Sequence, residues 1–225
     1  MNNNTVITIS RQYGSGGREL SNILAKKLGI KLYDRQIINL AAEQLGIQDM
    51  DFDKMKKLEE AIPPLSLKFM PFYVFGMNGA KPINNKMFEA ESKVVKQLSE
   101  DGSCIILGRC ADYILRDKEN VYSFYICAND KYREIRGKEI YEGKTLYELN
   151  EEDGKRGQYY QYYTGNKWGD SKNYNLIINT SDISLDEAAD IIINYVEMRQ
   201  KIIFKNIKRK RVRYFILLFL YDIFL

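Results

Sequence analysis

A glycine cluster between an apolar strand and an apolar helix constrains this chain more than any other feature of its sequence. The segment YGSGG, residues 13–17, follows a short β-branched run over residues 6–9. The apolar residues after it recur at the spacing of one helix face: Leu20, Ile23, Leu24 and Leu28. A loop that wraps an anion turns its amides inward, and the helix that follows adds the positive end of its dipole. We therefore predict an anion-binding loop made of Tyr13, Gly14, Ser15, Gly16, Gly17, Arg18 and Glu19.

The loop fits a dinucleotide-binding turn in part, and a glycine turn without any ligand is also compatible with the sequence. A dinucleotide turn has the pattern GxGxxG with an acid about 20 residues further on, and Asp34 lies at that distance from Gly14. Glu19 takes the place of the third glycine, where the helix has to pack closely against the strand. The sequence therefore favours a dinucleotide less than a phosphate.

The loop also departs from the Walker pattern, which is GxxxxGK followed by Ser or Thr. In that register the first glycine falls at Arg11 and the lysine at Gly17. The hydroxyl that binds magnesium falls at Arg18 or Glu19. The usual ammonium is absent from its place, so Arg18 or Arg11 has to supply the charge, through the two donors of a guanidinium.

Short apolar runs alternate with helical segments along the rest of the chain. The runs expected as strands cover residues 6–9, 30–33, 104–107, 121–127 and 176–179. The expected helices include residues 37–45, 87–99 and 146–163. A further helix is expected after its N-cap Asn129, and a last one begins at the capping box of Ser184 and Glu187. This order predicts a three-layer α/β fold, a mostly parallel sheet with helices on both faces. Ligands of such sheets bind beyond the carboxyl ends of the strands.

One domain is expected over residues 1–200, because 225 residues with 45% hydrophobic composition bury one substantial core. Between residues 48 and 86 the periodicity fades, and Pro and Gly alternate with Phe and Tyr. We expect a partly irregular insertion here, within a segment over about residues 35–86. The N-terminus shows no charged and apolar leader, so the expected location is cytoplasmic.

Residues 201–225 form a tail of unusual charge. The tail holds seven Lys or Arg and one acid, hence +6, so the rest of the chain carries −2 of the net +4. A body of that charge has no general basic surface, and we expect no nucleic-acid partner. The apolar end is too short to span a bilayer. Docking on the body or on a second subunit, an extension without a role, and peripheral contact with an anionic membrane all remain open.

The chain has no histidine, which excludes Ser-His-Asp and Cys-His mechanisms because the activating base is missing. Its cysteines, Cys104, Cys110 and Cys127, are odd in number and lack the CxxC spacing of a zinc site. We expect them to be reduced and buried, and no residue is assigned as a metal ligand.

Several blocks in order resemble the cytidylate kinase-like family, among the nucleoside monophosphate kinases. They are ITISRQYGSGGREL, KLYDRQII, IILGRCADYIL, KRGQYYQYYTGNKWGD and YNLIINTSDISLDEA, and they span about residues 5–197. The resemblance implies a P-loop kinase fold and ATP-dependent phosphoryl transfer, with magnesium, to a nucleoside monophosphate such as CMP or dCMP. The atypical loop leaves an alternative open, a nucleotide-binding module without phosphotransferase activity. The oligomeric state is not indicated.

Phosphoryl transfer needs converging cations, and the resemblance assigns several. Arg35 and Arg109 follow expected strands, and the resemblance makes them contacts of the acceptor, together with Asp34. Pairing of either arginine with a neighbouring acid is the alternative. Lys155 and Arg156 lie in a lid-like segment over about residues 145–170. The predicted catalytic residues are thus Arg18, Arg109, Lys155 and Arg156.

Aromatic residues are dense in the same lid-like segment. They are Tyr159, Tyr160, Tyr162, Tyr163 and Trp168. We expect most of them to pack the segment against its own domain and one or two to line the nucleotide site. Arg133 and Arg136, on the expected helix after residue 129, are weaker site candidates, because charged helix residues usually form a solvated face.

Overall fold

Five parallel strands form one sheet in the order β2-β3-β1-β4-β5, within a computed structural model that describes residues 4–46 and 83–202. Each neighbouring pair runs parallel. The central strand lies between β3 and β4, so that Ile7 pairs with Ile105 on one side and Tyr122 on the other. The strands are β1 (Val6–Arg11), β2 (Lys31–Tyr33), β3 (Cys104–Leu107), β4 (Val121–Cys127) and β5 (Leu176–Asn179). The predicted α/β fold with a mostly parallel sheet is confirmed.

The helices connect these strands and lie close to the predicted positions. They are α1 (Gly17–Leu28), α2 (Gln36–Gln44), α6 (Ile83–Leu98), α7 (Ala111–Ile114), α8 (Asp130–Ile140), α9 (Leu146–Thr164) and a last helix over residues 185–202. The predicted N-caps are confirmed: the Asn129 side chain accepts a hydrogen bond from the Tyr132 amide at 2.8 Å. Ser184 and Glu187 form the expected reciprocal capping box.

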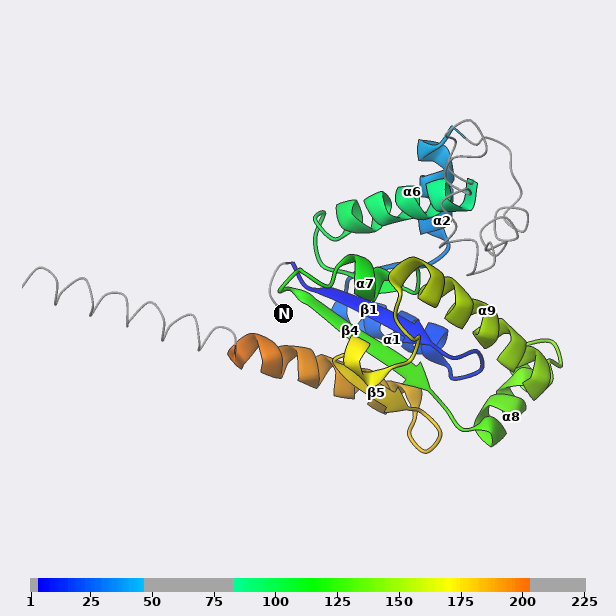
Figure 1. The fold of residues 1–225 in the computed structure, drawn as a ribbon. Coiled ribbons are helices and arrows are strands. Elements are labelled where there is room, and N and C mark those ends of the chain that lie inside the picture. The colour runs from blue at the N-terminus through cyan, green and yellow to red at the C-terminus, as the bar shows by residue number, and fades with distance from the viewer. Residues whose placement is uncertain (1–3, 47–82, 203–225) are drawn as a thin grey trace, which may run out of the picture.

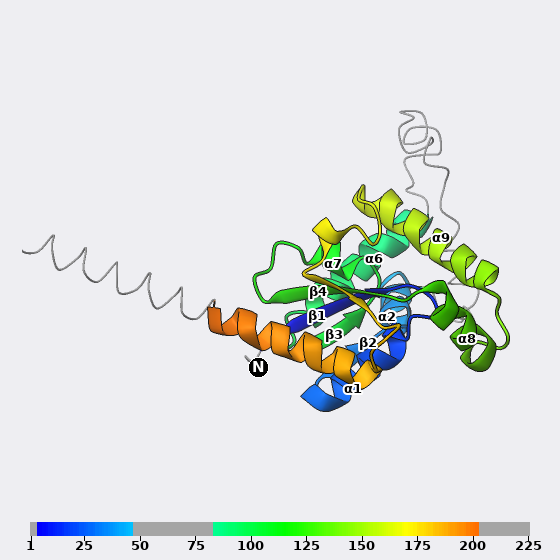
Figure 2. The same ribbon diagram turned by 90° about the horizontal axis from the view of Figure 1, so that it is seen from below.

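Two apolar cores lie on opposite faces of the sheet because neighbouring residues of a strand point to opposite sides. Along β1, Val6 packs in the core that α2, α6 and α7 cover. Ile7 and Ile9 pack in the other core, under α1 and the last helix. Figure 1 shows α2, α6 and α7 above the sheet and the last helix below it, and Figure 2 gives the view from below. The fold therefore has the three predicted layers.

The carboxyl ends of the strands meet at the edge of the sheet near α8 and α9 (Figure 1). The chain leaves β1 through α1 toward β2, whereas it leaves β4 through α8 and α9 toward β5. The connections of two adjacent strands therefore diverge between β1 and β4, the arrangement that opens a crevice for ligands. The glycine loop lies at this point.

Parts of the predicted organisation lie outside the described residues. The segment predicted over residues 35–86 begins with α2 and ends with the start of α6, but residues 47–82 between them are not among those described. The same applies to residues 203–225 of the tail, so the division of the chain stays a prediction. Within the described residues, no helix combines the length and the apolar character that a membrane span requires.

Candidate functional site

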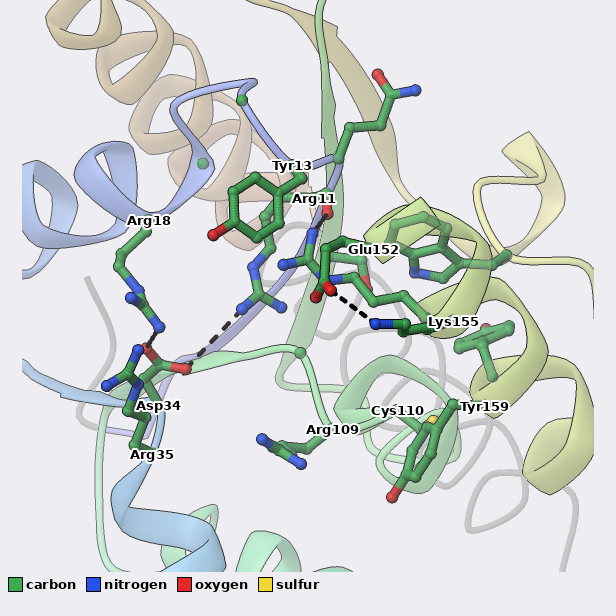
Figure 3. A pocket seen from close by; sticks show the side chains of 18 of the residues that line it. Arg11, Tyr13, Arg18, Asp34, Arg35, Arg109, Cys110, Glu152, Lys155 and Tyr159 are labelled. Atoms are coloured by element: carbon green, nitrogen blue, oxygen red, sulfur yellow. Dashed lines mark hydrogen bonds and ion pairs between the residues drawn. The ribbon is translucent and has the colours of Figure 1, made fainter. Parts of the chain in front are cut away.

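A cavity of about 260 Å³ opens between the glycine loop, the ends of β2 and β3, and helix α9 (Figure 3). Its walls include most of the predicted site residues and several others. They are Ser10, Arg11, Gln12, Tyr13, Gly14, Gly17, Arg18, Asp34, Arg35, Gly108, Arg109, Cys110, Tyr141, Glu152, Lys155, Arg156, Tyr159, Tyr160 and Trp168. The loop lies where the parallel sheet places ligands, at the carboxyl end of β1.

The loop is held in shape by two glycines and by bonds to the neighbouring strands. Gly14 and Gly16 have φ angles of 81° and 79°, which side chains rarely allow. The amide of Gln12 donates to the Ile126 carbonyl at 2.9 Å. The carbonyl of Ser15 accepts from the Thr180 hydroxyl at 2.7 Å. The loop is therefore anchored to β4 and to the end of β5, and α1 begins directly after it.

The side chain of Arg11 takes the space that a lysine at position 17 would need. A Cβ atom added to Gly17 would lie 2.5 Å from the Cβ of Arg11 and 2.9 Å from its Cγ. At the other end, a Cβ on Gly108 would lie 2.5 Å from Nη1 of Arg11. Two glycines thus make room for one arginine, which runs from the glycine loop to the end of β3. Burial, followed by the nearby Arg156 guanidinium, lowers the pKa of Arg11 from its ordinary value.

Arg18 and Arg11 reach the same carboxylate from two elements (Figure 3). Nη2 of Arg18 lies 2.6 Å from Oδ2 of Asp34, and Nη2 of Arg11 lies 3.9 Å from Oδ1. Arg18 stands in the first turn of α1, and Asp34 follows β2. The Arg18 side chain is 47% exposed, so this pair is open to solvent and to an incoming anion.

Asp153 of α9 holds the back of the glycine loop. Its Oδ1 accepts from the Tyr13 amide at 2.7 Å, and its Oδ2 from Nη2 of Arg133 at 2.7 Å. Arg133 is buried and also donates from Nε to the Tyr13 carbonyl at 2.8 Å. Arg156 contacts the same Oδ1 at 3.1 Å. These contacts fix the lid-like helix against the loop, and they explain why Arg133 does not line the cavity.

Arg109 projects into the cavity from a strained turn after β3. Gly108, Arg109 and Cys110 have φ angles of 77°, 59° and 51°. A left-handed residue other than glycine costs about 1 to 2 kcal/mol, so two in succession need support from the surrounding structure. The turn places Arg109 among the lining residues, opposite the glycine loop (Figure 3).

That support comes in part from a buried carboxylate on α6. Glu91 has no exposed surface, and its Oε1 lies 3.3 Å from Nη1 of Arg109. Its Oε2 accepts from the Tyr159 hydroxyl at 3.0 Å. Burial raises the pKa of Glu91 to about 7, and the hydrogen bond from Tyr159 opposes this only in part. Glu91 thus orients two lining residues without lining the cavity itself.

Three of the five aromatic residues of the lid-like segment line the cavity, one more than the largest number expected, and the others pack against the domain. Tyr160 donates to Oδ2 of Asp112 at 2.6 Å, and burial raises the pKa of that carboxyl to about 6. Tyr163 stacks on Phe88 of α6 with ring centroids 4.1 Å apart. Tyr159, Tyr160 and Trp168 line the cavity, whereas Tyr162 and Tyr163 do not.

The structure brings nine predicted site residues to the cavity wall and leaves three outside it. Those on the wall are Tyr13, Gly14, Gly17, Arg18, Asp34, Arg35, Arg109, Lys155 and Arg156. Ser15 and Gly16 belong to the loop but not to the wall, and Ser15 is buried with its hydroxyl bonded to the Gln12 carbonyl. Glu19 points to α8, where it pairs with Arg136 at 2.7 Å. Lys155 pairs with Glu152 at 2.9 Å.

Sequence reasoning missed Glu91 and Asp153 and left Arg11 as an alternative to Arg18. Glu91 carries little local signal, because a glutamate on a helix is usually solvated. Asp153 stands three residues before Arg156, a spacing that brings the two onto one helix face. The signal for Arg11 was the exchange of glycine and cation between positions 11 and 17.

The structure buries two of the three cysteines as predicted and leaves the third partly exposed. Cys104 and Cys110 are buried, Cys127 is half-buried, and none forms a disulfide. Among residues 4–46 and 83–202, no group of three Cys, Asp or Glu side chains is arranged to hold a metal ion. P-loop kinases generally use ATP with Mg²⁺, and this ion requires oxygen ligands.

The lining residues do not fit a magnesium ion held by protein groups. The carboxylates on the described wall are Asp34 and Glu152, and each faces a cation, Arg18 at 2.6 Å and Lys155 at 2.9 Å. The Walker hydroxyl position holds Arg18, and Glu19 points away. Mg²⁺ prefers carboxylate, hydroxyl and water oxygens, and guanidinium groups repel it.

Fold and site together define an α/β protein with the P-loop kinase fold. The model of the cytidylate kinase-like family matches residues 6–182, and the chain belongs to this family. No curated protein matches the chain.

The solved structures similar to this one include the following two. An uncharacterized protein from Eubacterium ventriosum is 26% identical, with a TM-score of 0.64, over 87% of this chain and 99% of that one. A gluconokinase from Sinorhizobium meliloti is 9% identical, with a TM-score of 0.51, over 90% of this chain and 97% of that one. The second likeness concerns the fold alone. The expected membership of the family is confirmed, and the fold is that of P-loop kinases.

Proposed function

We propose that this protein transfers the γ-phosphoryl group of ATP to a nucleoside monophosphate of the CMP or dCMP kind. The observation that carries the proposal is the convergence of five guanidinium groups on one cavity beside a glycine loop. They belong to Arg11, Arg18, Arg35, Arg109 and Arg156. Phosphoryl transfer depends on positioning and on neutralising the oxygens of the transferring group, which is what such a cluster supplies.

The proposed donor lies on the glycine loop. The loop amides and the start of α1 face its phosphates, and Arg11 and Arg18 neutralise their charge. Arg156 and Lys155 of α9 also line the cavity, and Nη1 of Arg156 donates to the Arg11 carbonyl at 3.2 Å. Water exclusion by this helix favours transfer over hydrolysis.

The proposed acceptor lies toward the ends of β2 and β3. Arg35 and Arg109 contact its phosphate, and Asp34 contacts its sugar or base. An acceptor phosphate is already ionised near neutral pH, so its oxygen attacks without a general base. This agrees with a chain that contains no histidine.

A coupled assay with a panel of nucleoside monophosphates, with gluconate as a contrasting acceptor, tests the proposal. We expect turnover with CMP or dCMP, and a loss of about 100-fold or more in Arg109→Ala, because its charge-assisted hydrogen bonds strengthen in the transition state. Lys138→Ala, on the exposed side of α8, is the matched control and should keep full activity. Turnover that survives both Arg18→Ala and Arg109→Ala contradicts the site assignment.

A second candidate is a nucleotide-binding module that does not transfer phosphate. The observation in its favour is the loop itself, where Gly17 and Arg18 replace the lysine and the hydroxyl of the Walker pattern. Calorimetry with ATP beside the turnover assay separates the two candidates. Binding without turnover for every acceptor supports the module, and turnover with one acceptor contradicts it.

A further inference from the structure

We infer that guanidinium groups replace both the loop lysine and the loop-bound magnesium ion, so that this site binds nucleoside polyphosphates without a divalent cation. The inference rests on the proposed nucleotide-binding function of the cavity and states how its charge is balanced. Two features of the described residues carry it: the exchange of residues 11 and 17, and the place of Arg18.

The first feature is a reciprocal exchange between two positions of the loop. The Walker pattern has glycine first and lysine seventh, whereas this loop has Arg11 first and Gly17 seventh. The structure gives the physical reason, since a Cβ at position 17 would lie 2.5 Å from the Cβ of Arg11. A cation at position 11 and a side chain at position 17 exclude each other. The positive charge of the loop therefore stands at position 11 and not at position 17. It still faces the cavity, because Arg11 lies on the cavity wall.

The second feature concerns the position of the metal-binding hydroxyl. Arg18 stands there, and its guanidinium is 2.6 Å from the carboxylate of Asp34. A carboxylate after a strand end and a loop hydroxyl are the groups with which proteins orient Mg²⁺ beside phosphates. In this cavity the carboxylate binds a guanidinium. A bound phosphate would therefore face the side chain of Arg18 where other loops place a metal ion.

Calorimetry with a non-hydrolysable ATP analogue, in EDTA and then in excess Mg²⁺, tests the inference on the full chain. We expect the dissociation constant in EDTA to be lower than that in Mg²⁺, or higher by no more than about threefold. Weakening in EDTA by more than that overturns the inference while the proposed function stands. No binding under either condition, in a chain whose thermal unfolding is cooperative, contradicts the proposed function itself.

A mutant cycle at positions 11 and 17 tests the exchange directly. Arg11→Gly should weaken binding of the analogue by about tenfold or more, since a charge-assisted hydrogen bond is lost. Adding Gly17→Lys to that variant returns the loop to the Walker order and should recover most of the affinity. Gly17→Lys alone should lose both affinity and thermal stability, because Arg11 fills the space.

The decisive comparison is between Arg11→Gly and the double variant, so it does not need the single lysine variant to fold. A double variant that binds no better than Arg11→Gly overturns the exchange. Lys138→Ala, which lies outside the cavity in an exposed pair with Glu134, is the matched control for loss of one cation and should bind as the parent does.

Discussion

Asp34 and Glu91 each pair with an arginine of the cavity, yet the two carboxylates lie in opposite surroundings. Asp34 is 18% exposed at its side chain and is shared by Arg18 at 2.6 Å and Arg11 at 3.9 Å. Glu91 has no exposed surface and faces Arg109 at 3.3 Å. We call Asp34 with Arg11 and Arg18 the loop side of the cavity. We call Glu91 with Arg109 and Tyr159 the helix side.

The difference shows which contacts are ready to exchange and which are fixed. A partly solvated ion pair contributes little to stability, so phosphate oxygens can displace Asp34 from the loop arginines at small cost. A buried carboxylate without its partner is costly, so Arg109 stays in its strained turn with or without a ligand. On the loop side, a bound phosphate would therefore replace Asp34 as the partner of the arginines. On the helix side, Arg109 already has the position in which it would contact a ligand.

The largest expected contrast is in the free energy of unfolding. Arg109→Met leaves Glu91 buried without its cation and should cost about 2 to 4 kcal/mol near pH 8. Arg18→Met, the matched loss on the loop side, should cost about 1 kcal/mol or less. Denaturant unfolding of the two variants and the parent gives the comparison. Equal losses would erase the distinction between the sides.

The second contrast is in the pH dependence of stability. The pKa of Glu91 is raised to about 7 in the fold, so the folded state binds this proton more tightly than the unfolded chain. Its contribution is complete below the ordinary pKa of 4.5 and is lost as pH rises through about 7. Unfolding measured from about pH 5 to pH 8 should show a decline that Glu91→Gln reduces by an amount on the order of 1 kcal/mol or more. Asp112 and Asp153, which the variant keeps, contribute to the remaining slope, since burial raises the pKa of both, that of Asp112 to about 6.

An unchanged slope in Glu91→Gln would mean that this carboxylate is neutral in both states or reached by solvent. The fixed helix side would then lose its main support.

The smallest contrast is in anion affinity on the loop side. Asp34→Asn removes the charge that competes for Arg11 and Arg18, and inorganic tripolyphosphate should bind about three- to tenfold more tightly. The free energy of unfolding should change by about 1 kcal/mol or less, because the pair is partly solvated. Calorimetry with tripolyphosphate measures the gain. Weaker binding would show that Asp34 orients the arginines and does not compete with the ligand.

The same variant separates the predicted acceptor role of Asp34 from its role at the loop. If Asp34 contacts the acceptor, the KM for CMP rises in Asp34→Asn while tripolyphosphate binds more tightly. A KM that stays unchanged removes Asp34 from the acceptor contacts. The two readouts move in opposite directions, so neither follows from a general loss of structure.

The strands, the main helices and the loop could be predicted because their signals are local. Glycines after a β-branched run indicate a tight turn from strand to helix, and parallel strands bring their carboxyl ends to one edge. Arg35 and Arg109 each follow a strand, so their arrival at one cavity needed only the topology. Lys155 and Arg156 were indicated by the family resemblance of the lid-like segment.

Tertiary structure decided which groups hold those arginines. The partners of Arg109 and Arg133 are Glu91 on α6 and Asp153 on α9, and no local pattern marks either pair. The same holds for Glu19, which the sequence placed in the loop and the fold turns toward Arg136. Pairing of this kind depends on how helices pack, and many packings suit the same periodicity.

The sequence by itself therefore determined that a phosphate-type loop begins α1 and that several cations follow strand ends. It also showed that the Walker lysine is missing. Only the fold decided that Arg11 takes the lysine's space, because that outcome depends on how closely Gly17 and Gly108 approach its side chain. Such distances between separate segments arise from close packing, where a single added carbon would collide.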